Sequence, residues 1–76
     1  MNEPTRRDFL IELRIKRRLT QAQVAHVLGV SPEYIGMIEN AKRNPTLPLA
    51  LKFEEFYGYP AAQLFLDLRR GGERSA

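Results

Sequence analysis

Two short runs that each carry the signals of a helix start stand on either side of a single glycine, and this spacing constrains the fold most strongly. Thr20 and Gln23 form the pattern of a capping box at the start of a helix over 21–28. Gly29 follows, and glycine is the residue best able to adopt the left-handed conformation that ends a helix. Ser31 then has the position of an N-cap for the next helix. So tight a turn predicts two helices that cross at a steep angle, with the second turned outward from the core.

A helix is also expected before this corner, over 6–17. Thr5 followed by Asp8 fits a capping box at its start. The apolar residues that recur along it at helical spacing are Phe9, Leu10 and Leu13. This spacing predicts a helix with one face on the core.

Two more helices are expected after the corner. One opens at Thr46 or Leu47 and ends at Gly58, and the next begins at Pro60. Their candidates for the core are Leu49, Leu51, Phe53, Phe56, Leu64, Phe65 and Leu68. No stretch alternates with period two for long enough to indicate a strand, so the predicted fold class is all-α.

The length and composition exclude several classes of function. The 76 residues suit one small domain at 1–68, with RRGGERSA at 69–76 as a polar tail. No apolar run approaches the ~20 residues of a membrane helix, and no signal segment opens the chain, so the expected location is cytoplasmic. There is no Cys, and His26 is the only His. Glu54 and Glu55 are adjacent and point in different directions on a helix, as surface groups do. The sequence therefore predicts no enzyme, no metal site and no cofactor.

The helix expected over 32–40 turns an unusual face outward. Its inner stripe is Ile35 and Ile38, and its outer positions are Pro32, Glu33, Gly36, Met37 and Asn40. None of these outer residues is basic, yet Lys42 and Arg43 follow directly. The net charge of +3 permits an anionic partner. The pattern suits a helix whose front meets base edges while its flanks touch phosphates, and a plain solvated face is the alternative.

Residues 9–65 resemble the Xre/Cro repressor-type helix-turn-helix family of bacteria and phages. The likeness is carried, at the family's spacing, by Leu13-Arg14, Thr20-Gln21, Ala25, Gly29-Val30-Ser31, Ile35, Ile38-Glu39 and Arg43-Asn44-Pro45, followed by LALKFEEFYG and QLF. The resemblance implies a compact five-helix, lambda-repressor-like DNA-binding domain with the helix-turn-helix at its second and third helices. It also implies a homodimer that binds a pseudo-palindromic operator in double-stranded DNA and controls transcription.

The same resemblance assigns phosphate contacts to the helix starts and to the loop after the recognition helix. The residues at these positions are Gln21, Ser31, Asn40, Lys42 and Arg43. For Gln21 the resemblance implies contact with the DNA backbone or with a base, and a solvated glutamine at the helix start is the alternative. Helix N-termini favour phosphate because their free N–H groups and dipole attract anions.

Base reading falls, by resemblance, to Pro32, Glu33, Gly36 and Met37, with Tyr34 at the edge. Only Glu33 can accept from cytosine N4, and Met37 offers apolar contact alone. Few side chains on this face can therefore recognise base edges directly, and recognition of DNA shape is expected to provide much of the sequence specificity. Tyr34 can stack, donate to a phosphate or pack half-buried, and these three alternatives stay open.

The resemblance also assigns two structural roles. Arg14 and Glu39 are expected to pair and so to join the first helix to the recognition helix, the alternative being that both are exposed. The residues expected at a dimer interface are Tyr57, Tyr59, Leu64, Phe65 and Leu68, some of which belong to the core.

Two departures from the family pattern concern helix ends. Arg18 occupies a position where the family often has Gly, and a left-handed backbone there would cost about 1 kcal/mol. Pro60 replaces the usual capping Ser of the last helix, which is therefore expected to be less well capped.

Two classes of function remain open. The first is a stand-alone repressor or controller-type regulator, for which no small-molecule effector is expected because the chain has no room for a sensory module. The second is an antitoxin that binds both a toxin protein and its own operator. The short polar tail gives little surface for wrapping a toxin, which favours the stand-alone regulator.

Overall fold

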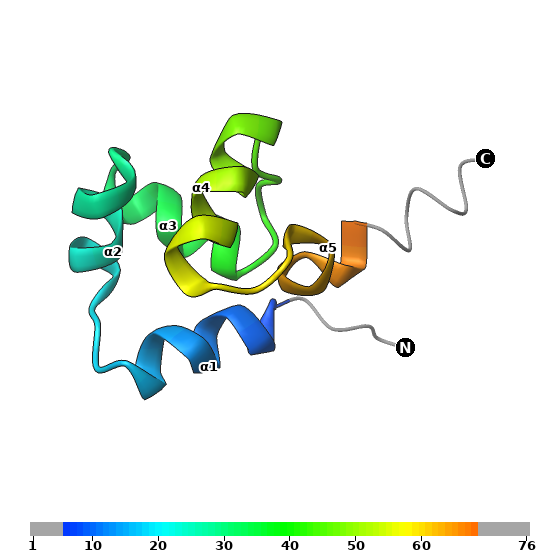
Figure 1. Ribbon diagram of the computed structural model, residues 1–76. Coiled ribbons are helices and arrows are strands. Elements are labelled where there is room, and N and C mark those ends of the chain that lie inside the picture. Colours follow the sequence, from blue (N-terminus) through cyan, green and yellow to red (C-terminus); the bar gives the residue numbers. More distant parts are fainter. Residues whose placement is uncertain (1–5, 69–76) are drawn as a thin grey trace.

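The computed structural model describes residues 6–68, and all regular structure in this range is helical. The helices are α1 (Asp8–Lys16), α2 (Gln21–Leu28), α3 (Pro32–Glu39), α4 (Leu47–Tyr57) and α5 (Ala61–Leu64). α3 packs against α1 and α2, and α4 packs against α2 and α5 (Figure 1). The all-α fold is therefore confirmed, whereas the predicted tail at 69–76 lies outside the described residues. No helix within 6–68 is long and apolar enough to cross a membrane.

The turn between α2 and α3 has the capping that the sequence predicts. The hydroxyl of Thr20 accepts from the N–H of Gln23 at 3.0 Å, and Gln23 Oε1 accepts from the N–H of Thr20 at 2.8 Å. Gly29 has a φ of 78°, and Ser31 Oγ accepts from the N–H of Tyr34 at 3.1 Å. These bonds satisfy N–H groups at the starts of both helices and fix the direction in which α3 leaves the turn.

One hydrophobic core lies between the helices. Val24 and Ala25 of α2 and Ile35 and Ile38 of α3 are at most 1% exposed. The small side chain of Ala25 lets the two helices approach closely at the corner. The other buried apolar residues are Leu10, Leu13, Leu28, Leu49, Ala50, Phe53, Tyr57, Leu64 and Phe65. In each long helix these residues recur with the helical period, so one stripe of the helix faces inward.

Basic side chains from other elements cover the carboxyl ends of two helices. Arg17 Nη1 donates to the carbonyl of Phe56 at 3.1 Å and its Nη2 to the carbonyl of Tyr57 at 2.7 Å, at the end of α4. Lys52 Nζ lies 3.4 Å from the carbonyl of Leu28, at the end of α2. The last carbonyls of a helix lack partners within it and carry partial negative charge, so these cations stabilise the helix ends.

α1 begins two residues later than the sequence predicts. Its N-cap is Arg7, which makes no capping bond through its side chain, and Asp8 is the first helical residue instead of the third. Thr5, the predicted cap, lies outside the described residues. At the other end, Arg18 has a φ of 59° and thus the left-handed backbone that its position suggested.

α4 begins and ends where the sequence predicts. The hydroxyl of Thr46 accepts from the N–H of Leu49 at 3.3 Å, and Gly58 ends the helix with a φ of 79°. Leu51 is 53% exposed, so its assignment to the core is wrong. The reason is its angular position, because two residues separate it by about 200° from Leu49 and from Phe53 on the buried stripe. Phe56, also assigned to the core, is half-buried against it.

The start of α5 is capped from α4. Pro60 supplies no side-chain cap, but Glu54 Oε1 accepts from the N–H of Ala61 at 3.2 Å. Glu54 is thus a capping residue and not the surface group that the sequence suggested. The helix that begins after Pro60 is also interrupted, because α5 ends at Leu64, a turn follows at Phe65, and residues 66–68 are helical again.

Candidate nucleic-acid interface

One face of α3 is exposed to solvent and carries no basic side chain. Pro32, Glu33 and Met37 are exposed along it, while Ile35 and Ile38 anchor the opposite face in the core. Ser31 is exposed as well, at the N-terminus of the helix. The arrangement leaves a carboxylate and a thioether accessible on a helix whose direction is fixed by the core and the capped turn.

Gln21 lies over α3 at the position of Gly36. A Cβ added to Gly36 would lie 3.5 Å from both Nε2 and Oε1 of Gln21, which is ordinary van der Waals contact. Gly36 is half-buried, and Gln21 is half-buried too. The first residue of α2 and the middle of α3 therefore form one continuous surface.

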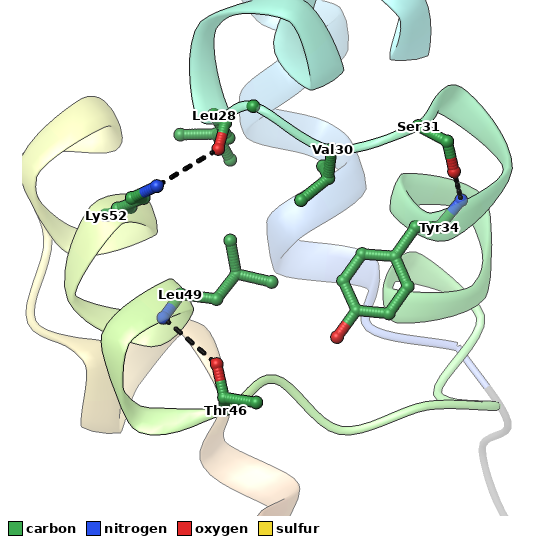
Figure 2. A pocket seen from close by; sticks show the side chains of 8 residues that line it. Leu28, Val30, Ser31, Tyr34, Thr46, Leu49 and Lys52 are labelled. Carbon is green, nitrogen blue, oxygen red and sulfur yellow. Dashed lines mark hydrogen bonds between the residues drawn. The ribbon is translucent and has the colours of Figure 1, made fainter.

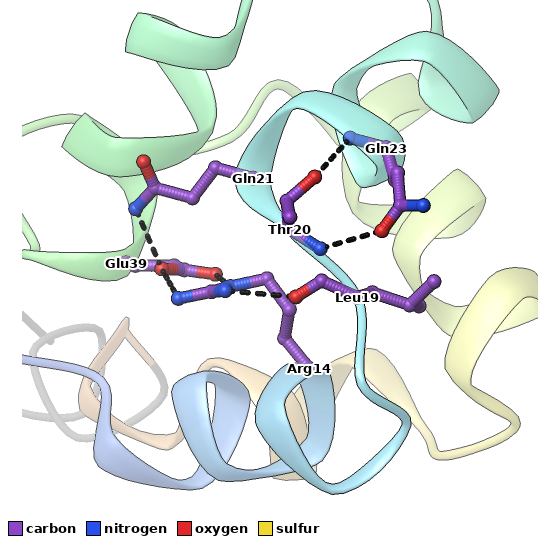
Figure 3. Close-up of polar contacts among 6 residues, drawn as sticks. All are labelled: Arg14, Leu19, Thr20, Gln21, Gln23 and Glu39. Atoms are coloured by element: carbon purple, nitrogen blue, oxygen red, sulfur yellow. Dashed lines mark hydrogen bonds and ion pairs between the residues drawn. The ribbon is translucent and has the colours of Figure 1, made fainter.

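Glu39, the last residue of α3, is buried and accepts hydrogen bonds from two helices (Figure 3). Arg14 of α1 donates from Nε to Oε2 at 2.6 Å and from Nη2 to Oε1 at 3.2 Å. Gln21 Nε2 donates to Oε1 at 3.0 Å, and Arg14 Nη1 donates to the carbonyl of Leu19 at 3.0 Å. The ion pair between Arg14 and Glu39 is present as expected, and the sequence did not indicate that Gln21 joins it. One amide hydrogen of Gln21 is thereby used inside the protein.

The loop after α3 leaves the helix through a left-handed residue that the sequence did not flag. Ala41 has a φ of 60°, its N–H donates to the carbonyl of Ile38 at 3.1 Å, and the N–H of Lys42 donates to the carbonyl of Met37 at 2.9 Å. This pair of bonds is the Schellman motif, which usually has Gly at the left-handed position. Asn40, Lys42 and Arg43 are all exposed around this turn.

Arg7 is the residue beside this loop that sequence reasoning missed. Its side chain is buried, and its Nη1 donates to the carbonyls of Ile38 at 2.7 Å and Arg43 at 2.9 Å. These partners lie 31 and 36 positions away in the chain. No helical period or local motif marks such a contact, so the sequence offered no signal for it.

Tyr34 points into a groove between the turn and α4 (Figure 2). The groove has a volume of about 520 Å³. It is lined by Leu28, Gly29, Val30, Ser31, Tyr34, Thr46, Leu49 and Lys52. The ring is half-buried and packs against the core. Of the three alternatives for Tyr34, its position supports packing.

The structure separates the five residues expected at a dimer interface into two groups. Tyr57, Leu64 and Phe65 are at most 3% exposed within the chain's own core, so their assignment to an interface is wrong. The reason is that α4 and α5 fold back on α1 and α2 and cover these side chains. Tyr59 and Leu68 are half-buried, and Tyr59 meets Phe9 edge to face with ring centroids 5.2 Å apart.

The hydroxyl group of Tyr57 is buried in the core. The oxygen makes no hydrogen bond within the described residues. Burial and, next, the negative charge of Glu39 raise the pKa of Tyr57 from 10.0 to about 12. The phenol therefore stays neutral at physiological pH.

Together, the capped corner, the exposed face of α3 and the basic loop after it define a helix-turn-helix protein. A family model described as Helix-turn-helix (HTH_3) matches residues 10–64. The chain belongs to this helix-turn-helix family, of the Xre type that the motifs indicate. The family is one of DNA-binding transcription regulators and is not a class of enzymes.

Two curated proteins are similar to the chain over most of this range. An uncharacterized HTH-type transcriptional regulator of Methanocaldococcus jannaschii is 40% identical over 53 residues, which cover 70% of this chain and 80% of the relative. The cryptic phage CTXphi transcriptional repressor RstR of Vibrio cholerae is 36% identical over 56 residues, covering 74% of this chain and 50% of the relative. The chain thus spans only half the length of the second relative. Family and relatives support DNA-binding transcription regulation as the class of function.

Proposed function

We propose that this protein is a transcriptional regulator that recognises an operator in double-stranded DNA by placing α3 in the major groove. The observation that carries the proposal is the way α3 is seated. Its inner face is fully buried, its end is fixed by the Arg14–Glu39 pair, and its outer face is open between a capped N-terminus and a basic loop. A helix held in this way can enter a groove without rearranging.

The contacts divide into backbone and base contacts. Ser31 at the N-terminus of α3 and Lys42 and Arg43 after its C-terminus face solvent at the two ends of the helix, where phosphates flank a groove. Asn40 lies beside the two cations, and Gln21 brings the start of α2 to the same surface. These residues set the position of the helix on any duplex.

Base reading belongs to the middle of α3. Glu33 accepts from a cytosine N4 amino group, and Met37 contacts a thymine methyl group. Pro32 brings apolar surface to the base edges without adding a donor, and at Gly36 the amide of Gln21 lies over the helix in place of a side chain. Because so few polar side chains contact base edges, the deformability and groove width of the operator contribute the remaining sequence specificity.

The regulator acts as a homodimer, and its action is repression, as in the phage relative named a transcriptional repressor. Apolar side chains remain exposed at the start of α4 and at the helical residues 66–68 after α5, where Leu47 is 72% and Leu66 51% exposed. Tyr59 and Leu68 add half-buried apolar surface. Two copies would place their recognition helices ~34 Å apart, one turn of DNA.

Selection of bound duplexes from a random pool at ~150 mM salt tests the function directly. We expect enrichment of a pseudo-palindromic site with half-sites about one helical turn apart. Recovery of a pool with no sequence preference would contradict operator recognition. Size-exclusion chromatography with light scattering tests the dimer separately, and a stable monomer at micromolar concentration would exclude it.

A further inference from the structure

The guanidinium of Arg7 joins the two ends of the loop that follows α3. Its Nη1 donates to the carbonyl of Ile38 at 2.7 Å and to the carbonyl of Arg43 at 2.9 Å. Its Nη2 donates to Oδ1 of Asn44 at 2.9 Å. The backbone N–H of Arg7 donates to the carbonyl of Glu39 at 2.7 Å. One residue before α1 therefore fixes both the last turn of α3 and the far side of the loop.

Asp67 holds this guanidinium from the opposite side. Its Oδ1 accepts from Nε and its Oδ2 from Nη2, both at 3.0 Å, in a fork-to-fork pair. The ring of Phe65 lies beneath the guanidinium, with 5.3 Å from Cζ to the ring centroid. All five N–H donors of Arg7 are thus used, and lysine, which has three donors in a different geometry, cannot replace them.

The loop that Arg7 closes contains the two exposed cations Lys42 and Arg43. It also contains Ala41 in the left-handed conformation, which L residues other than glycine adopt only at a cost. The bonds from Arg7 to Ile38 and Arg43 bracket this turn and hold it in place. Arg7 itself is 5% exposed and has no donor left for a phosphate.

We propose that Arg7, oriented by Asp67, is a positioning residue that sets Lys42 and Arg43 at the height of the DNA backbone when α3 lies in the groove. This inference rests on the proposed function. It assigns to a buried arginine and its exposed carboxylate partner, both remote from DNA, a share of the affinity for DNA. Arg7 acts through the two cations and makes no contact with DNA.

The Asp67→Asn variant gives a test in which two effects have opposite signs. The substitution removes one negative charge, so long-range attraction alone would tighten binding to DNA. Loss of the two-bond pair between Arg7 and Asp67 also frees the loop after α3. The positioning role therefore predicts weaker binding to DNA. We expect the Kd for a mixed-sequence 30-base-pair duplex to rise roughly threefold to tenfold, with the base preference from pool selection unchanged. Arg7→Lys, which keeps the charge and loses the fork, should weaken binding in the same range.

The control separates positioning from stability. Glu54→Ala removes the capping bond to Ala61 and destabilises the same end of the domain without touching Arg7. Glu54→Ala also removes the same negative charge as Asp67→Asn. Measured where circular dichroism shows every variant fully folded, it should therefore leave the Kd unchanged or slightly lower. Amide chemical shifts of Lys42 and Arg43 should move in Asp67→Asn and stay in place in Glu54→Ala.

A double-mutant cycle completes the test. In a protein that carries Lys42→Ala and Arg43→Ala, Asp67→Asn should no longer weaken binding, because the cations it positions are gone. An unchanged or lower Kd for Asp67→Asn in the otherwise wild-type protein would overturn the inference, and so would an equal loss in both backgrounds. If Lys42→Ala with Arg43→Ala binds as tightly as wild type, the two cations make no phosphate contact, and the inference is overturned while the proposed function stands. If the wild-type protein binds no duplex, the proposed function itself fails.

Discussion

The guanidinium of Arg14 lies against the carboxylate of Glu39, with Nε 2.6 Å from Oε2, and the two side chains are 15% and 3% exposed. The pair ties the middle of α1 to the last residue of α3. Because Gln21 Nε2 also donates to Glu39, three helices meet at one carboxylate. The orientation of the recognition helix therefore depends on a buried charge that is satisfied only when α1, α2 and α3 are all in place.

Removal of Glu39 should destabilise the domain strongly. Glu39→Ala leaves the cation of Arg14 poorly compensated, and we expect a loss of about 3–5 kcal/mol in the free energy of unfolding. The double variant Arg14→Met with Glu39→Leu should lose much less, since it removes both charges and keeps the volume. Urea denaturation of the three proteins measures this. Equal losses in the single and double variants would mean that the uncompensated charge is not the cause.

Tyr57→Phe should stabilise the protein at pH 7 by about 1 kcal/mol, because it removes a buried hydroxyl that has no partner among residues 6–68. The variant also tests a pH dependence. Since the folded pKa of about 12 exceeds the unfolded value of 10.0, the unfolded state loses its proton first as the pH rises. The contribution of Tyr57 to stability is therefore complete below pH 10 and is lost as the pH rises towards 12, by about 2–3 kcal/mol.

Urea denaturation of both proteins at several pH values between 8 and about 12 isolates this effect from the titration of other groups. The advantage of Tyr57→Phe over the wild type should widen above pH 10. A constant difference across that range would show that Tyr57 titrates in the folded protein as it does in the unfolded chain.

In the part of the chain that the structure describes, two residues other than glycine have a left-handed backbone, both at helix ends. Arg18 and Ala41 have φ values of 59° and 60°, and glycine at either position should raise the free energy of unfolding by about 1 kcal/mol. Ala22→Gly is the matched control, since Ala22 is an exposed residue inside α2 and the same glycine should cost about 0.5–1 kcal/mol there. Thermal and urea unfolding measure both the expected stabilisation at positions 18 and 41 and the expected destabilisation at position 22. Destabilisation by Arg18→Gly would show that its side chain contributes more than the backbone strain.

Loss of a loop cation should weaken binding to every DNA sequence alike. For Lys42→Ala or Arg43→Ala, the slope of log K against log salt should become shallower by about one unit. Lys16→Ala removes the same charge from the exposed end of α1 and should leave the slope nearly unchanged. Fluorescence anisotropy across a salt series distinguishes these outcomes, and equal slopes for all the variants would place the phosphate contacts elsewhere.

Glu33→Ala should relax the preference at one base pair of the operator without abolishing binding. The carboxylate is the one acidic group on the exposed face of α3 in the described structure, and it accepts from cytosine N4 in the proposed complex. Glu55→Ala, which removes an exposed carboxylate from α4, serves as the control. Pool selection with the two variants and the wild type compares their preferences, and identical profiles would refute the role of Glu33.

The helix-turn-helix could be predicted because its signals are local. Thr20, Gly29 and Ser31 each act within three or four residues, so their sequence positions are enough to fix both caps and the turn. The resemblance to the family added the prediction of the Arg14–Glu39 ion pair, which the helical spacing of apolar residues alone does not predict. DNA contact by individual residues stays a prediction.

Longer-range relations were beyond the sequence. Leu51 and Leu49 are equally apolar, and only the seating of α4 decides which of them is buried. Tyr57 and Phe65 fill the core because α4 and α5 fold back across the other helices, which a count of apolar residues does not reveal. Glu54 caps a helix seven positions away, and Arg7 finds its partners more than 30 positions along the chain.

The pair between Arg7 and Asp67 spans 60 positions of the chain. A contact of this separation forms only after the segments between have docked, since closing so long a loop is entropically unfavourable until then. It is therefore expected to form after the rate-limiting step of folding, so that weakening it hastens unfolding and leaves the folding rate almost unchanged. During synthesis the polypeptide cannot form the Arg7–Asp67 pair until Asp67 has left the ribosome. The loop after the recognition helix is therefore the last part of the proposed binding surface to become ordered.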